Sequence, residues 1–308
     1  MDLKQLEYIL KIAEENNITH AAKKLYITQS ALNQQLLKLE KELGTPLFHR
    51  SRSNWRLTPA GEIYIAASKR ILQIKQDSYN QIYDLEKQTK GKLSVGFTPN
   101  RGTALFSTVY PQFHKKFPQV MVEPMELSVL DQLDRIEDHS LDIGFLTLPT
   151  NQKKNSLTYL PMKSEEILLA VPSIGPYNSA AISEAGCKLP ILSLRQMKGE
   201  SFVLLYKKST IRSLVDALFQ SAGYLPNILF ETASTYTILN MIETGLCCGF
   251  IPAYYMDNEN KNITYYALPE HPSWDVVACY HSENYISEAA KAFIELARTF
   301  WNSDHPGN

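Results

Sequence analysis

Apolar side chains recur at helical spacing through the first sixty residues. The spacing i, i+3, i+4 and i+7 places side chains on one face of a helix. The first set with this spacing is Leu6, Ile9, Leu10 and Ala13. We predict that this helix ends near residues 16–17 and that a short second helix covers residues 19–25. A third helix is expected from Thr28, a good N-cap, to Gly44, a good C-terminal stop.

Polar side chains face away from the apolar stripe at the start of the third helix. They are Thr28, Gln29, Ser30, Asn33 and Gln34, with Lys38 one turn further on. Amide and hydroxyl groups both donate and accept hydrogen bonds, as the base edges in the major groove of DNA require. We predict that these residues bind DNA. The alternative, an ordinary solvated helix face, has the same composition and stays open.

Residues 47–58 have apolar ends around a basic, polar tip. The apolar side chains, which would anchor a hairpin to the helices, are Leu47, Phe48 and Leu57. The basic side chains, each able to neutralise a phosphate of the DNA backbone, are Arg50, Arg52 and Arg56. This pattern predicts a β-wing beside a helix-turn-helix.

Residues 59–87 form one long amphipathic pattern. Pro59 suits the first turn of a helix, and apolar residues follow near heptad spacing. They are Tyr64, Ala67, Ile71, Ile74, Ile82 and Leu85. A helix of about 30 residues is about 45 Å long and too narrow to bury this seam by itself. We predict that a second copy of the chain covers the seam and that Gly91 is a hinge; a helix lying on its own domain is the open alternative.

Beyond residue 91, short apolar runs alternate with amphipathic helices. Strands are expected at 93–97, 120–125, 142–146, 167–171, 202–206, 228–231, 248–251 and 276–280. This alternation predicts an α/β domain with a mostly parallel sheet. Several helices open on Ser or Thr directly behind a strand. Such turns gather at the carboxyl edge of a parallel sheet, where open α/β folds bind ligands.

Charge is unevenly distributed along the 308 residues. Residues 1–91 hold 14 Lys and Arg against 10 Asp and Glu, and the remainder holds 17 against 22. A basic N-terminal part suits an anionic partner such as nucleic acid. No apolar run approaches the roughly 18 residues that span a bilayer, and the first residues do not follow a signal-peptide pattern. We therefore expect a cytoplasmic protein without membrane contact.

Catalytic chemistry has no visible basis in the sequence. The motifs G-x-S-x-G, G-x-G-x-x-G, the Walker loop and H-E-x-x-H do not occur, and the seven histidines and four cysteines lack metal-ligand spacing. We expect no catalytic residue, no metal and no cofactor, and four buried thiols. An enzyme would need catalytic groups in the C-terminal half, and a purely structural protein would not need the polar face of the third helix.

Short motifs follow one another in a fixed order in the N-terminal part. They are NITHAAKKL at 17–25, TQSALNQQL at 28–36, Leu39-Glu40, Leu43-Gly44, PLFHR at 46–50 and LTPAG at 57–61. This series resembles the winged helix-turn-helix of LysR-type transcriptional regulators, and the resemblance continues more loosely over almost the whole chain. The family usually has Ser where this chain has Asn33, and often a basic residue where it has Gln34. We therefore expect a different base preference.

The resemblance implies a sequence-specific DNA-binding transcriptional regulator that is switched by a small-molecule effector. The implied parts are a winged helix-turn-helix at 1–58, a linker or dimerisation helix at 59–90 and an effector-binding domain at 91–308. That domain is expected to resemble periplasmic binding proteins, with lobe one at about 92–162 plus 268–302 and lobe two at about 163–267. The implied partners are double-stranded DNA, the effector, RNA polymerase and further copies of the chain in a homodimer or homotetramer.

The effector is expected between the two lobes, at the strand-to-helix turns. The candidate residues are Thr98, Asn100, Ser128 and Thr147 on lobe one, and Ser209, Thr210 and Thr235 on lobe two. Their hydroxyls and the N–H groups at the helix starts favour a small anion such as a carboxylate. Arg101 or Lys207 could add full positive charge. The alternative, that each hydroxyl only caps its own helix, stays open.

Overall fold

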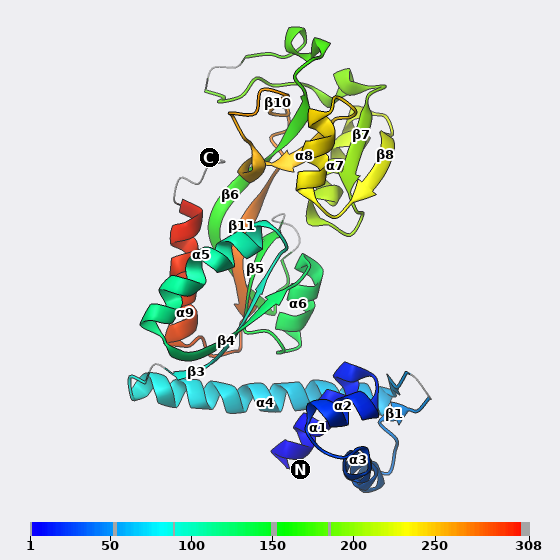
Figure 1. Cartoon of the computed structure of the whole chain (residues 1–308), viewed down its shortest axis with the longest axis vertical. Helices are drawn as coiled ribbons and strands as arrows, with labels where there is room; N and C mark the ends of the chain where they lie inside the picture. The colour runs from blue at the N-terminus through cyan, green and yellow to red at the C-terminus, as the bar shows by residue number, and fades with distance from the viewer. Residues whose placement is uncertain (1, 52–53, 89, 149–152, 184–185, 303–308) are drawn as a thin grey trace.

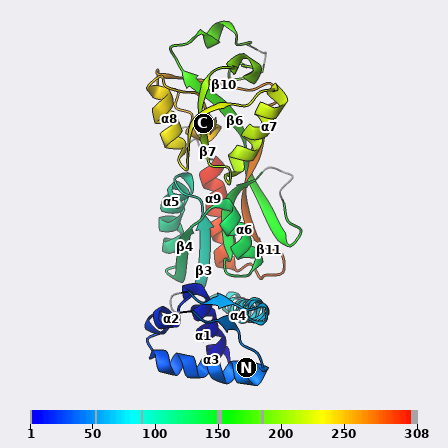
Figure 2. The same cartoon turned by 90° about the vertical axis from the view of Figure 1, so that its right-hand side faces the viewer.

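The computed structural model describes residues 2–51, 54–88, 90–148, 153–183 and 186–302. Figure 1 shows three parts stacked along the long axis of the molecule: a small helical domain, one long helix and a larger domain of two lobes. Figure 2, turned by 90°, shows the same order, with the small domain at one end and the second lobe at the other.

The small N-terminal domain is built from three helices and a two-stranded hairpin. Its elements are α1 (Leu3–Glu15), α2 (Ile18–Lys24), α3 (Gln29–Leu43), β1 (Phe48–His49) and β2 (Arg56–Leu57). Thr28 caps α3 by accepting a hydrogen bond from the Ala31 N–H at 3.2 Å, and Gly44 ends the helix in the left-handed conformation. Leu47 and Phe48 join the helices in one apolar core. The winged helix-turn-helix predicted from the pattern is confirmed.

Helix α4 (Pro59–Leu85) lies against both domains of its own chain. Near its start, Tyr64 is buried in the winged-helix core, and Ile71 packs partly buried against the same core. Its last turns run along the base of the larger domain, where Tyr285 Oη donates to Asp84 at 3.0 Å (Figure 1). The exposed apolar side chains of the helix are Ile63, Ile74, Tyr79, Ile82 and Leu85. The apolar seam is therefore divided between the domain core and an open surface.

Lobe one of the C-terminal domain is a sheet with helices on both faces (Figure 1). Its elements are β3 (Lys90–Phe97), α5 (Arg101–Lys116), β4 (Gln119–Glu126), α6 (Val129–Glu137), β5 (Ile143–Leu148), β11 (Ser273–His281) and α9 (Glu288–Asn302). Helices α5 and α9 cover one face, where Phe113 and Phe293 are fully buried, and α6 covers the other through Leu133 and Ile136.

Lobe two contains strands β9 (Gly249–Pro252) and β10 (Ile263–Tyr266), which pair with β6 (Leu157–Pro172), a separate two-stranded sheet of β7 (Ser201–Leu205) and β8 (Asn227–Thr232), and a second pair of helices. These helices are α7 (Thr210–Ala222) and α8 (Thr235–Glu243), and the lobe also contains the short 3-10 helices η2 (Pro176–Ser179), η3 (Leu194–Met197) and η4 (Ala253–Tyr255). Helix α7 buries Phe219 in one core and α8 buries Ile238 in another.

One long strand, β6 (Leu157–Pro172), carries the chain from the first lobe to the second. Residues 157–166 pair with β11 in lobe one, whereas residues 167–172 pair with β9 and β10 in lobe two. The chain returns between β10 and β11. Strand β6 therefore takes part in the strand pairing of both lobes, and the segment between β10 and β11 is the second connection between them.

The expected mostly parallel sheet is wrong. Among the described strands of this domain, β3 is parallel to β4 and β5, and β7 is parallel to β8, but β6 and β11 are antiparallel to every strand they pair with. A short apolar run predicts a buried strand without fixing its direction. Strand β10, which the sequence did not indicate, is one of the antiparallel partners.

The hinge expected at Gly91 is also wrong. Gly91 lies inside β3, where it pairs with Val120 of β4, and its φ of +140° is the reason a glycine suits the position. The hydrogen bonds between β3 and β4 hold the backbone at this position. Gly91 is therefore part of the sheet and not of a flexible connection between α4 and the C-terminal domain.

Candidate DNA-binding surface and effector cavity

The polar start of α3 lies at the end of the molecule remote from the lobes (Figure 2). Gln29, Gln34 and Lys38 are exposed, whereas Asn33 is half-buried. Thr28 uses its side-chain oxygen to cap the helix, and the same oxygen lies 3.1 Å from Ser30 Oγ. The residues predicted to bind DNA therefore share one accessible face, and the two hydroxyls among them also hold the turn.

The wing arginines differ in what holds them. Arg50 Nη2 donates to the carboxylate of Glu40, which is buried and accepts the Leu47 N–H at 2.8 Å. Arg50 therefore ties the wing to α3. Arg56 is exposed on β2 and opposes His49 in the hairpin. Arg52 lies outside the described residues.

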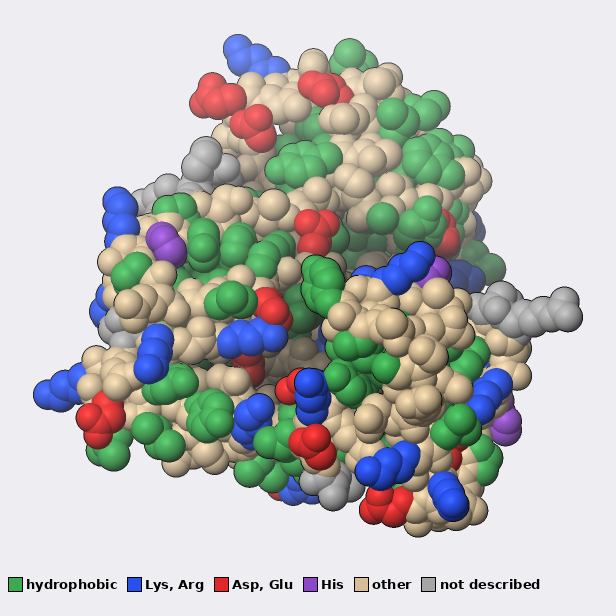
Figure 3. All heavy atoms as spheres, turned by 60° about the horizontal axis from the view of Figure 1, so that its bottom comes forward, with side chains coloured by type: hydrophobic (Ala, Val, Ile, Leu, Met, Phe, Trp, Pro, Cys, Tyr) green, Lys and Arg blue, Asp and Glu red, His purple; other side chains and the backbone are tan. Residues whose placement is uncertain are grey.

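Figure 3 brings this end of the molecule forward. Lys and Arg side chains lie scattered on this face among Asp and Glu side chains, hydrophobic side chains and other uncharged surface. Contact with a phosphate backbone would therefore depend on individual cations near α3 and the wing, because the described Lys and Arg side chains visible on this face do not join into a continuous basic stripe.

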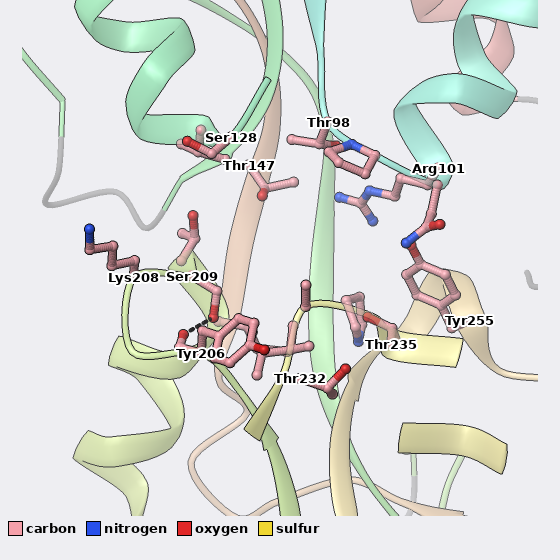
Figure 4. Close-up of a pocket in the computed structure, with 18 of the residues that line it drawn as sticks. Thr98, Arg101, Ser128, Thr147, Tyr206, Lys208, Ser209, Thr232, Thr235 and Tyr255 are labelled. Carbon is pink, nitrogen blue, oxygen red and sulfur yellow. Dashed lines mark hydrogen bonds between the residues drawn. The ribbon is translucent and has the colours of Figure 1, made fainter. Parts of the chain in front are cut away.

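All seven polar residues predicted for the effector line one cavity of about 320 Å³ between the lobes. They are Thr98, Asn100, Ser128, Thr147, Ser209, Thr210 and Thr235. Figure 4 shows Thr98, Ser128 and Thr147 on one side of the opening and Ser209 and Thr235 on the other. The structure thus brings together side chains from turns that lie more than half the length of the C-terminal domain apart in sequence.

The hydroxyl side chains at this cavity differ in whether they cap a helix, line the cavity or do both. Ser128 Oγ caps α6 by accepting the Asp131 N–H at 3.1 Å and also lines the cavity. At α8 the cap is Ser234, which accepts the Thr237 N–H at 3.4 Å, while the neighbouring Thr235 is buried at the cavity wall. At α6 one hydroxyl therefore both caps the helix and lines the cavity, whereas at α8 two neighbouring residues divide these roles.

Helix α5 begins later than expected. Its N-cap is Asn100, which has a φ of 64° and makes no side-chain capping hydrogen bond. Thr98 and Pro99 precede the helix and line the cavity instead of capping it. This start of α5 forms part of the cavity wall.

Arg101 is the charged group that lies deepest at this cavity. It is 6% exposed, and Figure 4 shows its guanidinium directed into the space between the lobes. Nη1 donates to Glu165 at 2.5 Å, but Nη2 is buried and finds no hydrogen-bond partner among the described residues. A buried donor without a partner loses the free energy of a hydrogen bond that it would make in water. The cavity wall therefore contains an unsatisfied cationic donor.

Glu165 holds this arginine and joins the lobes. Its carboxylate accepts hydrogen bonds from Arg101, from Trp274 Nε1 at 2.6 Å and from the Tyr254 N–H at 2.8 Å. These partners belong to α5, to β11 and to η4 of lobe two. One buried carboxylate on β6 thus connects elements of lobe one with an element of lobe two.

Sequence reasoning missed Glu165, which holds the buried arginine, and several residues that line the cavity. Glu165 lies within a long strand without any motif, and Tyr206, Thr232 and Tyr255 reach the cavity only through the tertiary fold. The candidate cation Lys207 is exposed and does not line the cavity, whereas its neighbour Lys208 does. A turn between strand and helix lets adjacent side chains diverge, so sequence proximity could not choose between the two lysines.

Three of the four thiols lie in surroundings that disfavour the reactive thiolate. Cys247, Cys248 and Cys279 are buried, and burial raises the pKa of Cys248 and of Cys279 to about 12. Cys187 is only half-buried, so the expectation of four buried thiols is wrong at that position. Within the described ranges, no group of three or more His, Cys, Asp or Glu side chains is arranged to hold a metal ion. Across the same ranges, no helix has the length and apolar character to cross a bilayer.

A winged helix-turn-helix joined by a long helix to two lobes around a cavity defines a ligand-responsive DNA-binding regulator. Residues 3–62 match the family model for bacterial regulatory helix-turn-helix proteins of the lysR family, and residues 86–302 match the LysR substrate binding domain. The chain belongs to the LysR family of transcriptional regulators. Proteins of this family are regulators and not enzymes; they bind DNA and small-molecule effectors and are oligomeric.

Individual relatives cover nearly the whole chain. The uncharacterized HTH-type transcriptional regulator YcgK of Bacillus subtilis is 29% identical over 307 residues, which are 97% of this chain and 94% of YcgK. Full-length OxyR of Pseudomonas aeruginosa, in a substituted form, shares the fold with a TM-score of 0.72 at 24% identity, covering 97% and 98% of the two chains. CbnR in complex with its target DNA has a TM-score of 0.58 at 19% identity, covering 97% of this chain and 99% of CbnR.

Proposed function

We propose that this regulator reads DNA with the start of α3 and grips the backbone with its wing. Gln29, Asn33 and Gln34 would contact base edges, and Lys38, Arg56 and Arg52 would neutralise phosphates. The observation that supports this proposal most directly is the exposed polar face of α3 together with the exposed Arg56. Arg50 has a structural partner in Glu40, so its phosphate contact would be secondary to anchoring the wing.

The test is selection of a duplex sequence by the full chain, followed by titration of the selected and a random duplex. Gln29→Ala should cost about 1–3 kcal/mol on the selected duplex and little on the random one. Arg56→Ala should weaken both alike and lower the slope of log affinity against log salt by about one. Equal losses for Gln29→Ala on both duplexes would contradict base reading by this residue.

We propose that the effector is a small carboxylate bound between the lobes, with lobe one at about 92–162 plus 268–302 and lobe two at about 163–267. The observation that supports this class is the unsatisfied Nη2 of buried Arg101 at the wall of a cavity that several hydroxyl side chains, Lys208 and apolar side chains also line. A carboxylate oxygen can accept from the guanidinium and from the N–H groups at the start of α5. Binding that favours a closed arrangement of the lobes would shift the helices α4 and thereby the geometry of the bound DNA.

A thermal-shift screen of small carboxylates on the full chain tests this class, because a ligand of the native state raises the unfolding temperature by mass action. A carboxylate that stabilises the parent should lose most of its effect on Arg101→Gln and part of it on Thr98→Val and Thr210→Val. Lys207→Gln is the matched control, since Lys207 lies outside the cavity. Undiminished stabilisation of all three cavity variants would show that the site is elsewhere.

We propose further that two chains pair through the open surface of α4 and that two dimers associate through their effector domains into a tetramer. This assembly would contact RNA polymerase in the cytoplasm. Ile74 and Ile82 are 60% and 53% exposed on a helix that both domains leave partly uncovered. Asp at both positions should produce a monomer in sedimentation. Ile71 is unsuitable for this test because it packs on the winged-helix core. An unchanged oligomer would place the interface elsewhere.

A further inference from the structure

The turn between α2 and α3 carries an aromatic side chain that the fold does not use. Tyr26 is 96% exposed, and its φ of +55° lies in the left-handed region, which bulky side chains adopt only at a cost in stability. Its neighbours Leu25 and Ile27 pack against the winged-helix core, and the Tyr26 N–H donates to the Lys23 carbonyl at 3.2 Å. The backbone is therefore fixed on both sides while the ring lies in solvent.

Folding alone favours a different residue at this position. A glycine adopts a positive φ without strain, and a ring that is almost fully exposed gains no burial in the free protein. Strain of this kind is a reason to look for function. Tyr26 lies two residues before Thr28, the N-cap of α3, so the ring stands beside the end of the helix that enters the major groove in helix-turn-helix proteins.

We propose that Tyr26 contacts the sugar–phosphate backbone of bound duplex DNA. Its hydroxyl donates to a phosphate oxygen, and its ring covers the adjacent deoxyribose. This inference rests on the proposed docking of α3. Tyrosine hydroxyls are among the groups that position such domains on phosphates. The last turn of α2 adds Lys23 and Lys24, both exposed, so the charge beside the ring suits a polyanion.

This contact differs in two measurable ways from the others at the interface. A phosphate contact carries no base information, so its loss weakens binding to every sequence alike. A neutral hydroxyl displaces no condensed counterion, so its loss leaves the salt dependence unchanged, unlike the loss of Arg56. The expected signature is a uniform loss of affinity at constant salt slope.

The test is titration of the full chain with a random duplex at several salt concentrations, together with thermal unfolding. Tyr26→Phe should weaken binding about 2- to 10-fold, and Tyr26→Gly should weaken it at least as much while its unfolding temperature stays the same or rises. The salt slopes should equal that of the parent. Tyr236→Phe, at a tyrosine of lobe two that is 52% exposed, is the matched control and should change nothing.

Each other outcome has a distinct meaning. Parent-like affinity of both Tyr26 variants for the random duplex would overturn the proposal. A change of oligomeric state in sedimentation, with DNA affinity retained, would also overturn it by assigning the ring to a protein contact. If Tyr26→Gly does not fold, Tyr26→Phe decides alone, since it removes one oxygen from an exposed ring. Failure of the parent itself to bind any duplex would contradict the DNA-binding function and not this residue's part in it.

Discussion

The wing and the junction of the two lobes are held by the same arrangement at different depths. In the wing, Arg50 donates to Glu40 and lies 5.5 Å from the centroid of the Trp55 ring. At the junction, Arg101 donates to Glu165 and lies 5.5 Å from the centroid of the Trp274 ring. The Arg50 side chain is 38% exposed, whereas that of Arg101 is 6% exposed.

The difference in depth decides what each arginine does. Water screens an ion pair at the surface, so the pair at the wing contributes little beyond its geometry. The pair at the junction has lost its water, so each charge depends on the other and on further hydrogen bonds. Glu165 has those bonds through Trp274 and Tyr254, but Arg101 still has one free donor. The surface pair is complete without a ligand, and the buried pair is not.

The largest expected effect follows from breaking the buried pair. Glu165→Ala leaves Arg101 as an uncompensated buried charge and should destabilise the C-terminal domain by about 3–5 kcal/mol. Hydrogen exchange of individual peptides at increasing urea concentration measures this loss of stability in the C-terminal domain. Peptides of the winged-helix domain should keep the protection that they have in the parent. The control is Glu166→Ala. Glu166 is the next residue along the strand, its side chain is partly exposed, and its carboxylate pairs with His271. A loss below about 1 kcal/mol would mean that the pair is screened like a surface pair.

A smaller effect is expected from the carboxylate of the wing. Glu40→Ala removes the partner of the Leu47 N–H as well as that of Arg50, so we expect a loss of about 1–3 kcal/mol in the winged-helix domain. The same exchange measurement should now show loss of protection in peptides of the winged-helix core, residues 2–51 and 54–65, and not in peptides of the C-terminal domain. Glu42→Ala is the matched control on the exposed face of α3. Equal losses for the two variants would refute the anchoring role of Glu40.

Removing the exposed arginine should cost less than removing its carboxylate. Arg50→Ala is expected to change the stability of the winged-helix domain by about 0–1 kcal/mol, because the Arg50 side chain is 38% exposed and water screens its charge. A double-mutant cycle with Glu40→Ala measures the coupling directly. If the coupling equals that of Arg101 with Glu165, depth is not what distinguishes the two sites.

The smallest expected effect is a decrease in the stability of the C-terminal domain as the pH falls. Burial and the neighbouring His139 ring lower the pKa of His281, against the opposing effect of Glu283. The unfolded chain then binds the proton more readily than the folded one, so stability present above about pH 6.5 declines as the pH falls toward the lowered value. Protection of the C-terminal domain should decrease slightly between pH 7.5 and 5.5. His281→Gln should remove that decrease; persistence of the slope would assign it to another group.

Local rules determined the N-terminal half well. The N-cap Thr28, the stop at Gly44 and the leucine stripe between them act within a few residues, so the sequence alone was sufficient to place α3 and its exposed polar face. The same rules placed the turns behind strands, and the structure gathers all seven hydroxyl and amide residues chosen in this way around one cavity. Capping and burial periodicity are short-range properties, and the surrounding fold overrode them at the start of α5, where Asn100 takes the N-cap position expected for Thr98.

Tertiary structure alone decided the rest. The direction of β6 and β11, and the choice of Lys208 over Lys207 at the cavity, depend on which strands meet and not on any local pattern. Arg101 and Glu165 are 64 residues apart and carry no motif, yet they form the most buried ion pair of the described chain. The sequence determines which side chains cap, turn and avoid water, because those preferences are local. Which distant charges share one dry site is set by packing, because the free energy of a buried pair exists only once both groups have left the solvent.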